Sequence, residues 1–71
     1  MTTFRRELGV RIKAERKRQS MTARELCRRS GLSPAFVSEL ENAKRGLGIE
    51  SAVSIARALG VSVGWLVGEV R

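Results

Sequence analysis

The side chains that could take part in chemistry are mostly cations. The 71-residue sequence contains 14 lysines and arginines against 7 acidic residues, which gives a net charge of +7. It contains no histidine, aspartate or tyrosine, and only one cysteine. A nucleophile–histidine pair, a zinc site of histidines or paired cysteines, and an aspartate-based metal site are therefore excluded. No glycine-rich phosphate-binding motif occurs. The sequence predicts a binding protein without a catalytic site, cofactor or metal.

The excess of positive charge indicates what kind of partner is bound. Such a surface attracts polyanions, of which nucleic acid is the first candidate and an anionic membrane the second. No apolar run approaches the roughly 20 residues of a membrane span, and the N-terminal residues lack the apolar run of a secretory signal. A lone thiol without such a signal is typical of the cytoplasm. We therefore expect a cytoplasmic protein that binds nucleic acid and not membranes.

One stretch near the middle of the chain has the signals of two short helices joined by a tight turn. Thr22 and Glu25 have the spacing of a capping box, which predicts that Thr22 begins a helix. Gly31 supplies the left-handed residue that ends this helix. Ser33 repeats the N-cap signal, and Pro34 follows where its missing N–H costs nothing. This pattern is typical of a helix-turn-helix, whose DNA-binding version lays its second helix in the major groove.

The whole chain is predicted to form one all-α domain, residues 1–71, without strands, repeats or linkers. Five helices are expected, at about 4–19, 23–29, 34–42, 49–59 and 63–67. In the first helix, Phe4, Leu8 and Ile12 recur every four residues and should face the core, with Val10 widening the apolar face. We therefore expect no effector or peptidase domain.

Three other apolar residues have specific interpretations. Cys27 is expected to be a small buried hydrophobe, because no activating neighbour of a reactive thiol is visible. Phe36 either forms an edge of the core or covers the groove beside the third helix. Trp65 either closes the core or contacts a partner.

The outer face of the predicted third helix carries small and polar side chains that suit close approach to base edges. Ala35 could touch a thymine methyl group. Glu39 could accept a hydrogen bond from cytosine N4 or steer a neighbouring arginine. A solvated surface without a partner is the alternative interpretation of this face. The candidate base-reading residues are Ser33, Ala35, Ser38 and Glu39.

Cations around these two helices are candidates for phosphate contacts. Arg24 and Arg28 lie four residues apart on one outer face of the predicted second helix. Lys44 and Arg45 follow the third helix, where they either complement the helix dipole or hold phosphates. The basic face of the first helix is either solvated or in contact with phosphate. The predicted phosphate-binding residues are Arg24, Arg28, Asn42, Lys44 and Arg45.

Arg16 falls on the apolar face of the first helix, four residues past Ile12. An arginine aligned with core residues needs a partner, and Glu41 at the end of the third helix is the best candidate. The alternative is that Arg16 reaches water with its stem over the core. We therefore expect a partly buried ion pair between Arg16 and Glu41.

Four segments carry motifs: L-G-x-R-I-K from Leu8, T-x-x-E-L-C-x-x-S-G-L-S from Thr22, V-S-E-L-E-N from Val37, and I-A-R-A-L-G-V-S-V-G-W-L from Ile55. Together they resemble the Cro/cI-type (XRE-like) helix-turn-helix family of phage repressors and small bacterial transcriptional regulators. The resemblance implies a five-helix, lambda-repressor-like fold that reads double-stranded DNA with its second and third helices, usually as a dimer. Its frequent arginine–glutamate pair between the first and third helices would be Arg16 and Glu41.

The chain departs from that family at several positions near the expected DNA contacts. Many members have glutamine where this chain has Ala23, and polar readers where it has Pro34 and Ala35. The third helix usually ends in glycine where this chain has Ala43. The following loop often has proline where this chain has Leu47.

The sequence therefore predicts a sequence-specific DNA-binding transcriptional regulator. We expect a homodimer on a near-palindromic operator, with residues 63–70 as the dimer surface and no small-molecule ligand. A phage repressor, a restriction–modification controller and an autoregulated antitoxin-like repressor are all consistent with this prediction. The alternatives are a protein-interaction module with the same fold, such as an antitoxin-like partner-binding protein, and a protein that coats nucleic acid without sequence preference.

Overall fold

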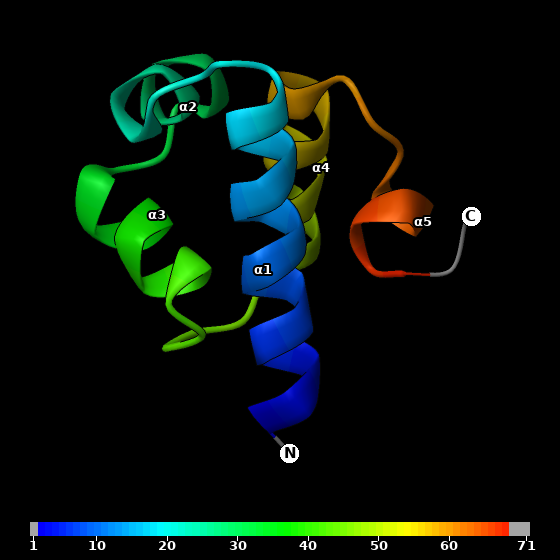
Figure 1. Ribbon diagram of the computed structural model, residues 1–71. Helices are drawn as coiled ribbons and strands as arrows, with labels where there is room; N and C mark the ends of the chain where they lie inside the picture. The colour runs from blue at the N-terminus through cyan, green and yellow to red at the C-terminus, as the bar shows by residue number, and fades with distance from the viewer. Residues whose placement is uncertain (1, 69–71) are drawn as a thin grey trace.

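The computed structural model describes residues 2–68, and this part of the chain contains helices and no strand. Figure 1 shows α1 standing at the centre, with α2 and α3 on one side of it and α5 on the other. The predicted all-α, five-helix architecture is confirmed, with helix ends within two residues of the expected ones. The helices are α1 (Thr2–Arg18), α2 (Ala23–Ser30), α3 (Pro34–Glu41), α4 (Ile49–Leu59) and α5 (Val63–Leu66).

Three of the helices begin at hydroxyl caps, and the sequence predicts those of α2 and α3. The side-chain oxygen of Thr22 accepts a hydrogen bond from the backbone N–H of Glu25 at 3.0 Å. Ser33 and Ser62 bind the backbone N–H groups three residues further on in the same way, at 3.1 Å and 2.9 Å. Each cap satisfies an N–H that has no partner inside its helix, so α2, α3 and α5 start at fixed residues.

The ends of α3 and α4 share one geometry but use different residues. Both helices close with the paired hydrogen bonds of a Schellman motif, centred on Gly60 (φ 72°) after α4 and on Ala43 (φ 62°) after α3. The left-handed region suits Gly60, whereas it costs an alanine about 1–2 kcal/mol because of its Cβ. Ala43 therefore has a helix-ending conformation that glycine usually adopts, with strain stored at the end of α3.

The core is formed by side chains from all five helices and by Met21 between α1 and α2. Phe36 and Trp65 are half-buried and pack against it, as the core interpretation of each requires. Cys27 also packs against the core but is half-buried and not fully buried as expected. No helix within residues 2–68 has the length and apolar character needed to cross a membrane. The buried apolar residues are Leu8, Ile12, Met21, Leu26, Val37, Leu40, Ala52, Ile55, Ala56, Leu59 and Leu66.

Two residues of the expected core face of α1 are exposed instead. Phe4 is 52% exposed and Val10 is 61% exposed, so their predicted burial is wrong. Phe4 lies in the first turns of α1, which extend beyond the other helices in Figure 1. Val10 follows Leu8 by two residues, which turns it about 200° away around the helix axis. Leu8 and Ile12 are buried as expected.

A buried polar cluster ties the end of α1 to the end of α4. Gln19 donates through its Nε2 to the Leu59 carbonyl at 2.7 Å and to the Glu15 carboxylate at 2.8 Å. Hydrogen bonds to Glu15 from Arg18, and then from Gln19, lower the pKa of this carboxyl to about 2. Glu15 is therefore ionised at neutral pH and can accept all of these bonds.

Helices α1 and α3 touch most closely at Gly9. A Cβ atom at residue 9 would lie 2.7 Å from the carbonyl oxygen of Leu40 and 2.8 Å from that of Glu41. Both oxygens belong to the backbone of α3, which cannot rotate away as a flexible side chain could. Gly9 therefore sets the distance between the two helices.

We expect Gly9→Ala to lower the free energy of unfolding by about 1–3 kcal/mol, the usual cost of overpacking a well-packed contact. Urea unfolding followed by circular dichroism measures this loss. Gly46→Ala is the matched control, since its added Cβ would meet only the Arg5 side chain, at 3.5 Å. Equal stability changes in the two variants would show that the α1–α3 contact tolerates a methyl group.

Candidate nucleic-acid interface

A bidentate ion pair between Arg16 and Glu41 fixes the end of α3 to α1. Arg16 Nε donates to Glu41 Oε2 at 2.8 Å, and Arg16 Nη2 donates to Glu41 Oε1 at 3.1 Å. The two side chains are only 10% and 8% exposed. The third nitrogen, Nη1, donates to the carbonyl oxygen of Met21 at 2.9 Å. The predicted pair between Arg16 and Glu41 is present, and it also holds the turn that leads into α2.

The outer face of α3 is exposed along its length, while Val37 and Leu40 face the core. The Ser33 hydroxyl accepts the capping hydrogen bond of α3, and its proton remains free to be donated. Asn42 donates through Nδ2 to the Ser38 carbonyl oxygen at 2.8 Å and contacts the Ser38 hydroxyl at 3.5 Å. The four predicted base-reading residues lie on this exposed side: Ser33, Ala35, Ser38 and Glu39.

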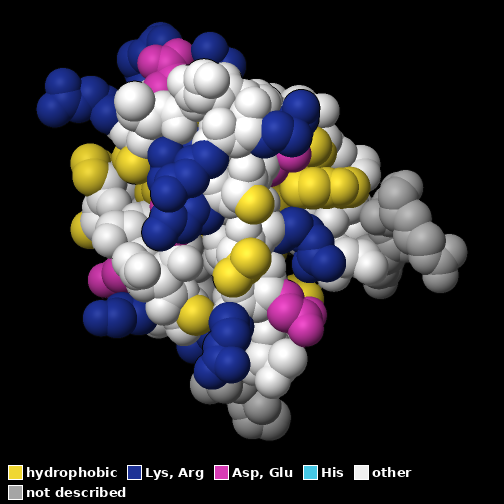
Figure 2. Space-filling view, viewed as in Figure 1, with side chains coloured by type: hydrophobic (Ala, Val, Ile, Leu, Met, Phe, Trp, Pro, Cys, Tyr) yellow, Lys and Arg dark blue, Asp and Glu magenta, His cyan; other side chains and the backbone are white. Residues whose placement is uncertain are grey.

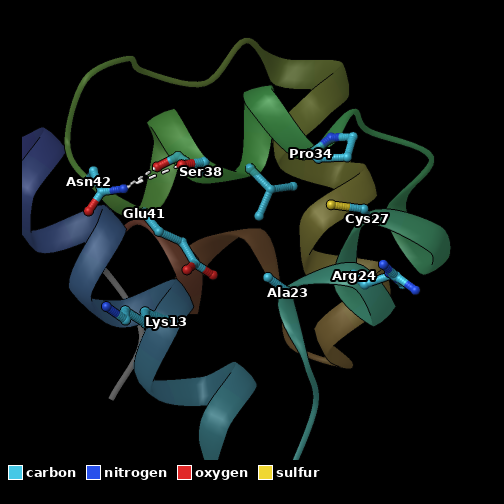
Figure 3. A pocket seen from close by; sticks show the side chains of 9 residues that line it. Lys13, Ala23, Arg24, Cys27, Pro34, Ser38, Glu41 and Asn42 are labelled. Atoms are coloured by element: carbon cyan, nitrogen blue, oxygen red, sulfur yellow. Dashed lines mark hydrogen bonds between the residues drawn. The ribbon is translucent and has the colours of Figure 1, made fainter.

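A groove of about 310 Å³ runs between α1, α2 and α3 (Figure 3). Arg24 from α2 and Asn42 from the end of α3 both border it, so two predicted phosphate-binding residues come together here. Ala23 and Pro34, two of the departures from the family pattern, also form its wall. The residues that line the groove are Lys13, Ala23, Arg24, Cys27, Pro34, Val37, Ser38, Glu41 and Asn42.

The other predicted phosphate-binding cations have different surroundings. Arg28 donates to the Glu25 carboxylate, which also accepts from Arg29 at 2.7 Å. These hydrogen bonds lower the pKa of Glu25, and the bond from Arg29 has the larger effect. Arg45 donates to Glu39, whereas Lys44 is exposed beside it. Figure 2 shows lysine and arginine side chains distributed over the face of the molecule viewed in Figure 1.

Comparison with known proteins gives this arrangement a family. The sequence profile described as Helix-turn-helix matches residues 12–66. The chain belongs to the helix-turn-helix family of DNA-binding transcriptional regulators. This family is one of transcriptional regulators and not of enzymes. The recognition of this family from sequence motifs is confirmed.

Individual relatives support the same assignment. The chain is 32% identical over 62 residues to an immunity repressor protein of Bacillus phage phi105, covering 87% of this chain and 43% of the repressor. It is 35% identical to the clp gene regulator ClgR from Corynebacterium glutamicum, with a TM-score of 0.83 over 93% of this chain and 86% of that one. The restriction–modification controller protein C.AhdI from Aeromonas hydrophila shares the fold, with a TM-score of 0.84, 22% identity and coverage of 87% and 94%. The chain thus spans less than half of the phage repressor.

Sequence reasoning missed one residue and one contact of this surface. Lys13 reaches the groove from α1, because it follows Gly9 by four residues and therefore lies on the same side of the helix, toward α3. The spacing was visible in the sequence, but the contact made by Gly9 was not. The stacking of Arg45 on Phe36 was also missed, because the path of the loop after α3 determines it.

We expect Glu41→Ala to lower the free energy of unfolding by about 3–5 kcal/mol, because it leaves the guanidinium of Arg16 buried without its carboxylate partner. Glu39→Ala is the matched control. It breaks an ion pair whose side chains are 42% and 48% exposed, for which we expect less than about 1 kcal/mol. Chemical unfolding of both variants checks the difference. Similar small losses would mean that the Arg16–Glu41 pair does not hold α3 in place.

Proposed function

We propose that the protein recognises a near-palindromic operator as a homodimer and represses transcription from the promoter that contains it. The main support is the exposed outer face of α3, which is held rigid by the Ser33 cap at one end and the Arg16–Glu41 pair at the other. A helix held in this way can enter the major groove in a single register. Relatives named as an immunity repressor and as a clp gene regulator support a role in transcription control.

Base reading is assigned in this proposal to the outer face of α3. Ser33 and Ser38 offer hydroxyl groups that can donate or accept, and Ala35 offers a methyl group to thymine. Glu39 can accept from cytosine N4. Because Ser33, Ala35 and Ser38 are small, the helix backbone can approach the bases closely.

Phosphate binding is assigned to side chains that flank this face. Arg24 and Asn42 border the groove between α2 and α3, and Lys44 follows the end of α3. Arg28 and Arg45 join them once they exchange their glutamate partners for phosphates. Lys13 is added to the predicted set because it lines the same groove. Such contacts set the register on DNA and supply affinity that does not depend on sequence.

Dimerisation is assigned to α5 and the residues that follow it. Val63, Trp65 and Val67 are half-buried within the monomer and leave apolar surface at this end of the molecule. Val70, also part of the predicted dimer surface, lies outside the described residues. A two-fold axis beside α5 would present two copies of α3 to the same side of the DNA.

Selection from a random-sequence DNA pool, followed by sequencing of the bound molecules, tests the proposal. We expect enrichment of a near-palindrome whose half-sites are about one helical turn apart, the spacing of a helix-turn-helix dimer. Sedimentation of the protein with the selected duplex should give two protomers per operator. Binding without enrichment that vanishes as salt rises would indicate a nucleic-acid coat. Little affinity for any DNA would indicate a protein-interaction module.

Two single substitutions distinguish residues that recognise bases from residues that bind phosphates. We expect Lys44→Ala to weaken operator and random DNA alike and to reduce the slope of log K against log salt by about one, as loss of one phosphate contact does. Ser38→Ala should change the preferred base at one position per half-site and leave the salt slope unchanged. Binding titrations at several salt concentrations measure both effects. A change in preferred sequence with Lys44→Ala would contradict its assignment to phosphate.

A further inference from the structure

Arg45 and Glu39, which the proposed function assigns to phosphate and base, are bound to each other in this structure. Arg45 Nη1 donates to Glu39 Oε1 at 3.0 Å. The guanidinium carbon of Arg45 lies 4.0 Å from the centre of the Phe36 ring, so the cation stacks on that aromatic face. Phe36 and Glu39 are three residues apart on α3, and Arg45 folds back from the following loop to reach both.

This arrangement leaves one polar group without a partner. Within the described part of the chain, the Nε atom of Arg45 is buried and makes no hydrogen bond. A buried donor without an acceptor opposes the conformation that creates it. The ion pair itself is half-exposed and is easily broken in water. Arg45 is therefore held by the stack and one hydrogen bond, but it gains a full set of acceptors if it moves to a phosphate.

The pairing also changes how the surface meets DNA. A carboxylate beside Arg45 cancels most of its attraction for phosphate, and the same carboxylate repels phosphates itself. While the pair is closed, neither side chain can act on DNA. When the pair opens, both become available together.

We propose that Glu39 restrains Arg45 and that this restraint increases sequence specificity. On a sequence that presents a donor such as cytosine N4 to α3, the Glu39 carboxylate moves to the base and releases Arg45 to a phosphate. On other sequences the pair stays closed and Arg45 adds little affinity. Phe36 is a positioning residue that keeps the guanidinium beside Glu39. This inference rests on the proposed function and assigns a regulated use to two of its contacts.

The test is a double-mutant cycle of Glu39→Gln and Arg45→Gln, with binding to the selected operator and to a random duplex at several salt concentrations. Glu39→Gln alone should bind random DNA about 3–10 times more tightly at low salt, because Arg45 is now free to make one more phosphate contact. The added contact should steepen the salt slope by about 0.9, so the gain shrinks about threefold between roughly 50 and 200 mM salt. The ratio of operator to random-DNA affinity should fall about tenfold.

Arg45→Gln should remove most of the gain, so that adding Glu39→Gln to it tightens random-DNA binding no more than the loss of one exposed carboxylate does elsewhere on the protein. Glu7→Gln is the matched control for net charge. It removes one exposed carboxylate from the side of α1 near Val10 and Arg11, away from α3, and should give a smaller gain that does not depend on Arg45. Thermal melts of all variants should match the wild type, since the substituted side chains are exposed or half-exposed.

An equal gain from Glu39→Gln with and without Arg45 would overturn the inference, because Glu39 would then act by repelling phosphates directly. Full retention of sequence preference in Glu39→Gln would overturn it as well. Failure of the proposed function has a different signature, since the wild-type protein would then enrich no operator in the selection. A wild-type operator combined with additive effects would leave the function intact and remove only the restraint.

Discussion

The buried pair between Arg16 and Glu41 is the interaction on which the candidate DNA-binding surface depends. One guanidinium binds the last residue of α3 through two nitrogens and the Met21 carbonyl through the third. The orientation of α3 and the entry into α2 therefore follow from the same side chain of α1. A planar donor with fixed geometry suits this task, whereas a lysine ammonium would have no fork to match the carboxylate. Helices α2 and α3 are short and separately capped, and the hydrogen bonds of Arg16 fix their positions relative to each other.

The close packing of α1 against α3 helps to keep the ion pair between these two helices buried. Gly9 brings the backbone of α1 against the carbonyl oxygens that end α3, and Arg16 lies two turns further along α1, where it binds Glu41. Without the close approach at Gly9, the carboxylate would stand further from Arg16 and more water would enter between the charges. The contact at Gly9 thus helps to make the pair at Arg16 a buried one, and Lys13 between them reaches the groove as a consequence.

Much of this could be predicted from sequence because the deciding interactions are local. The hydroxyl caps of Thr22 and Ser33 and the left-handed Gly31 fix helix ends from a few neighbouring residues, and the sequence predicts all three correctly. The wrong and missed predictions concern contacts with residues that are distant in the sequence. The burial of Phe4 and Val10 depends on how far the other helices extend along α1, which periodicity does not reveal. The Arg45 stack depends on the path that leaves Ala43, where an alanine adopts a conformation usually left to glycine.

The arrangement of ion pairs offers a physical basis for the proposed sequence specificity of so basic a chain. Glutamates neutralise Arg16, Arg18 and Arg45, and Glu25 is shared by two further arginines. Each neutralised cation contributes less to the attraction that all DNA sequences share. The pair at Arg16 is buried, but the pair at Arg45 is half-exposed and borders the surface of α3. In the proposed mechanism, only an operator sequence that binds the Glu39 carboxylate frees the positive charge of Arg45 for a phosphate. The outer face of α3 has few polar side chains that can read bases. Its sequence specificity can then come from a phosphate contact that forms only on the operator, as well as from direct contacts to bases.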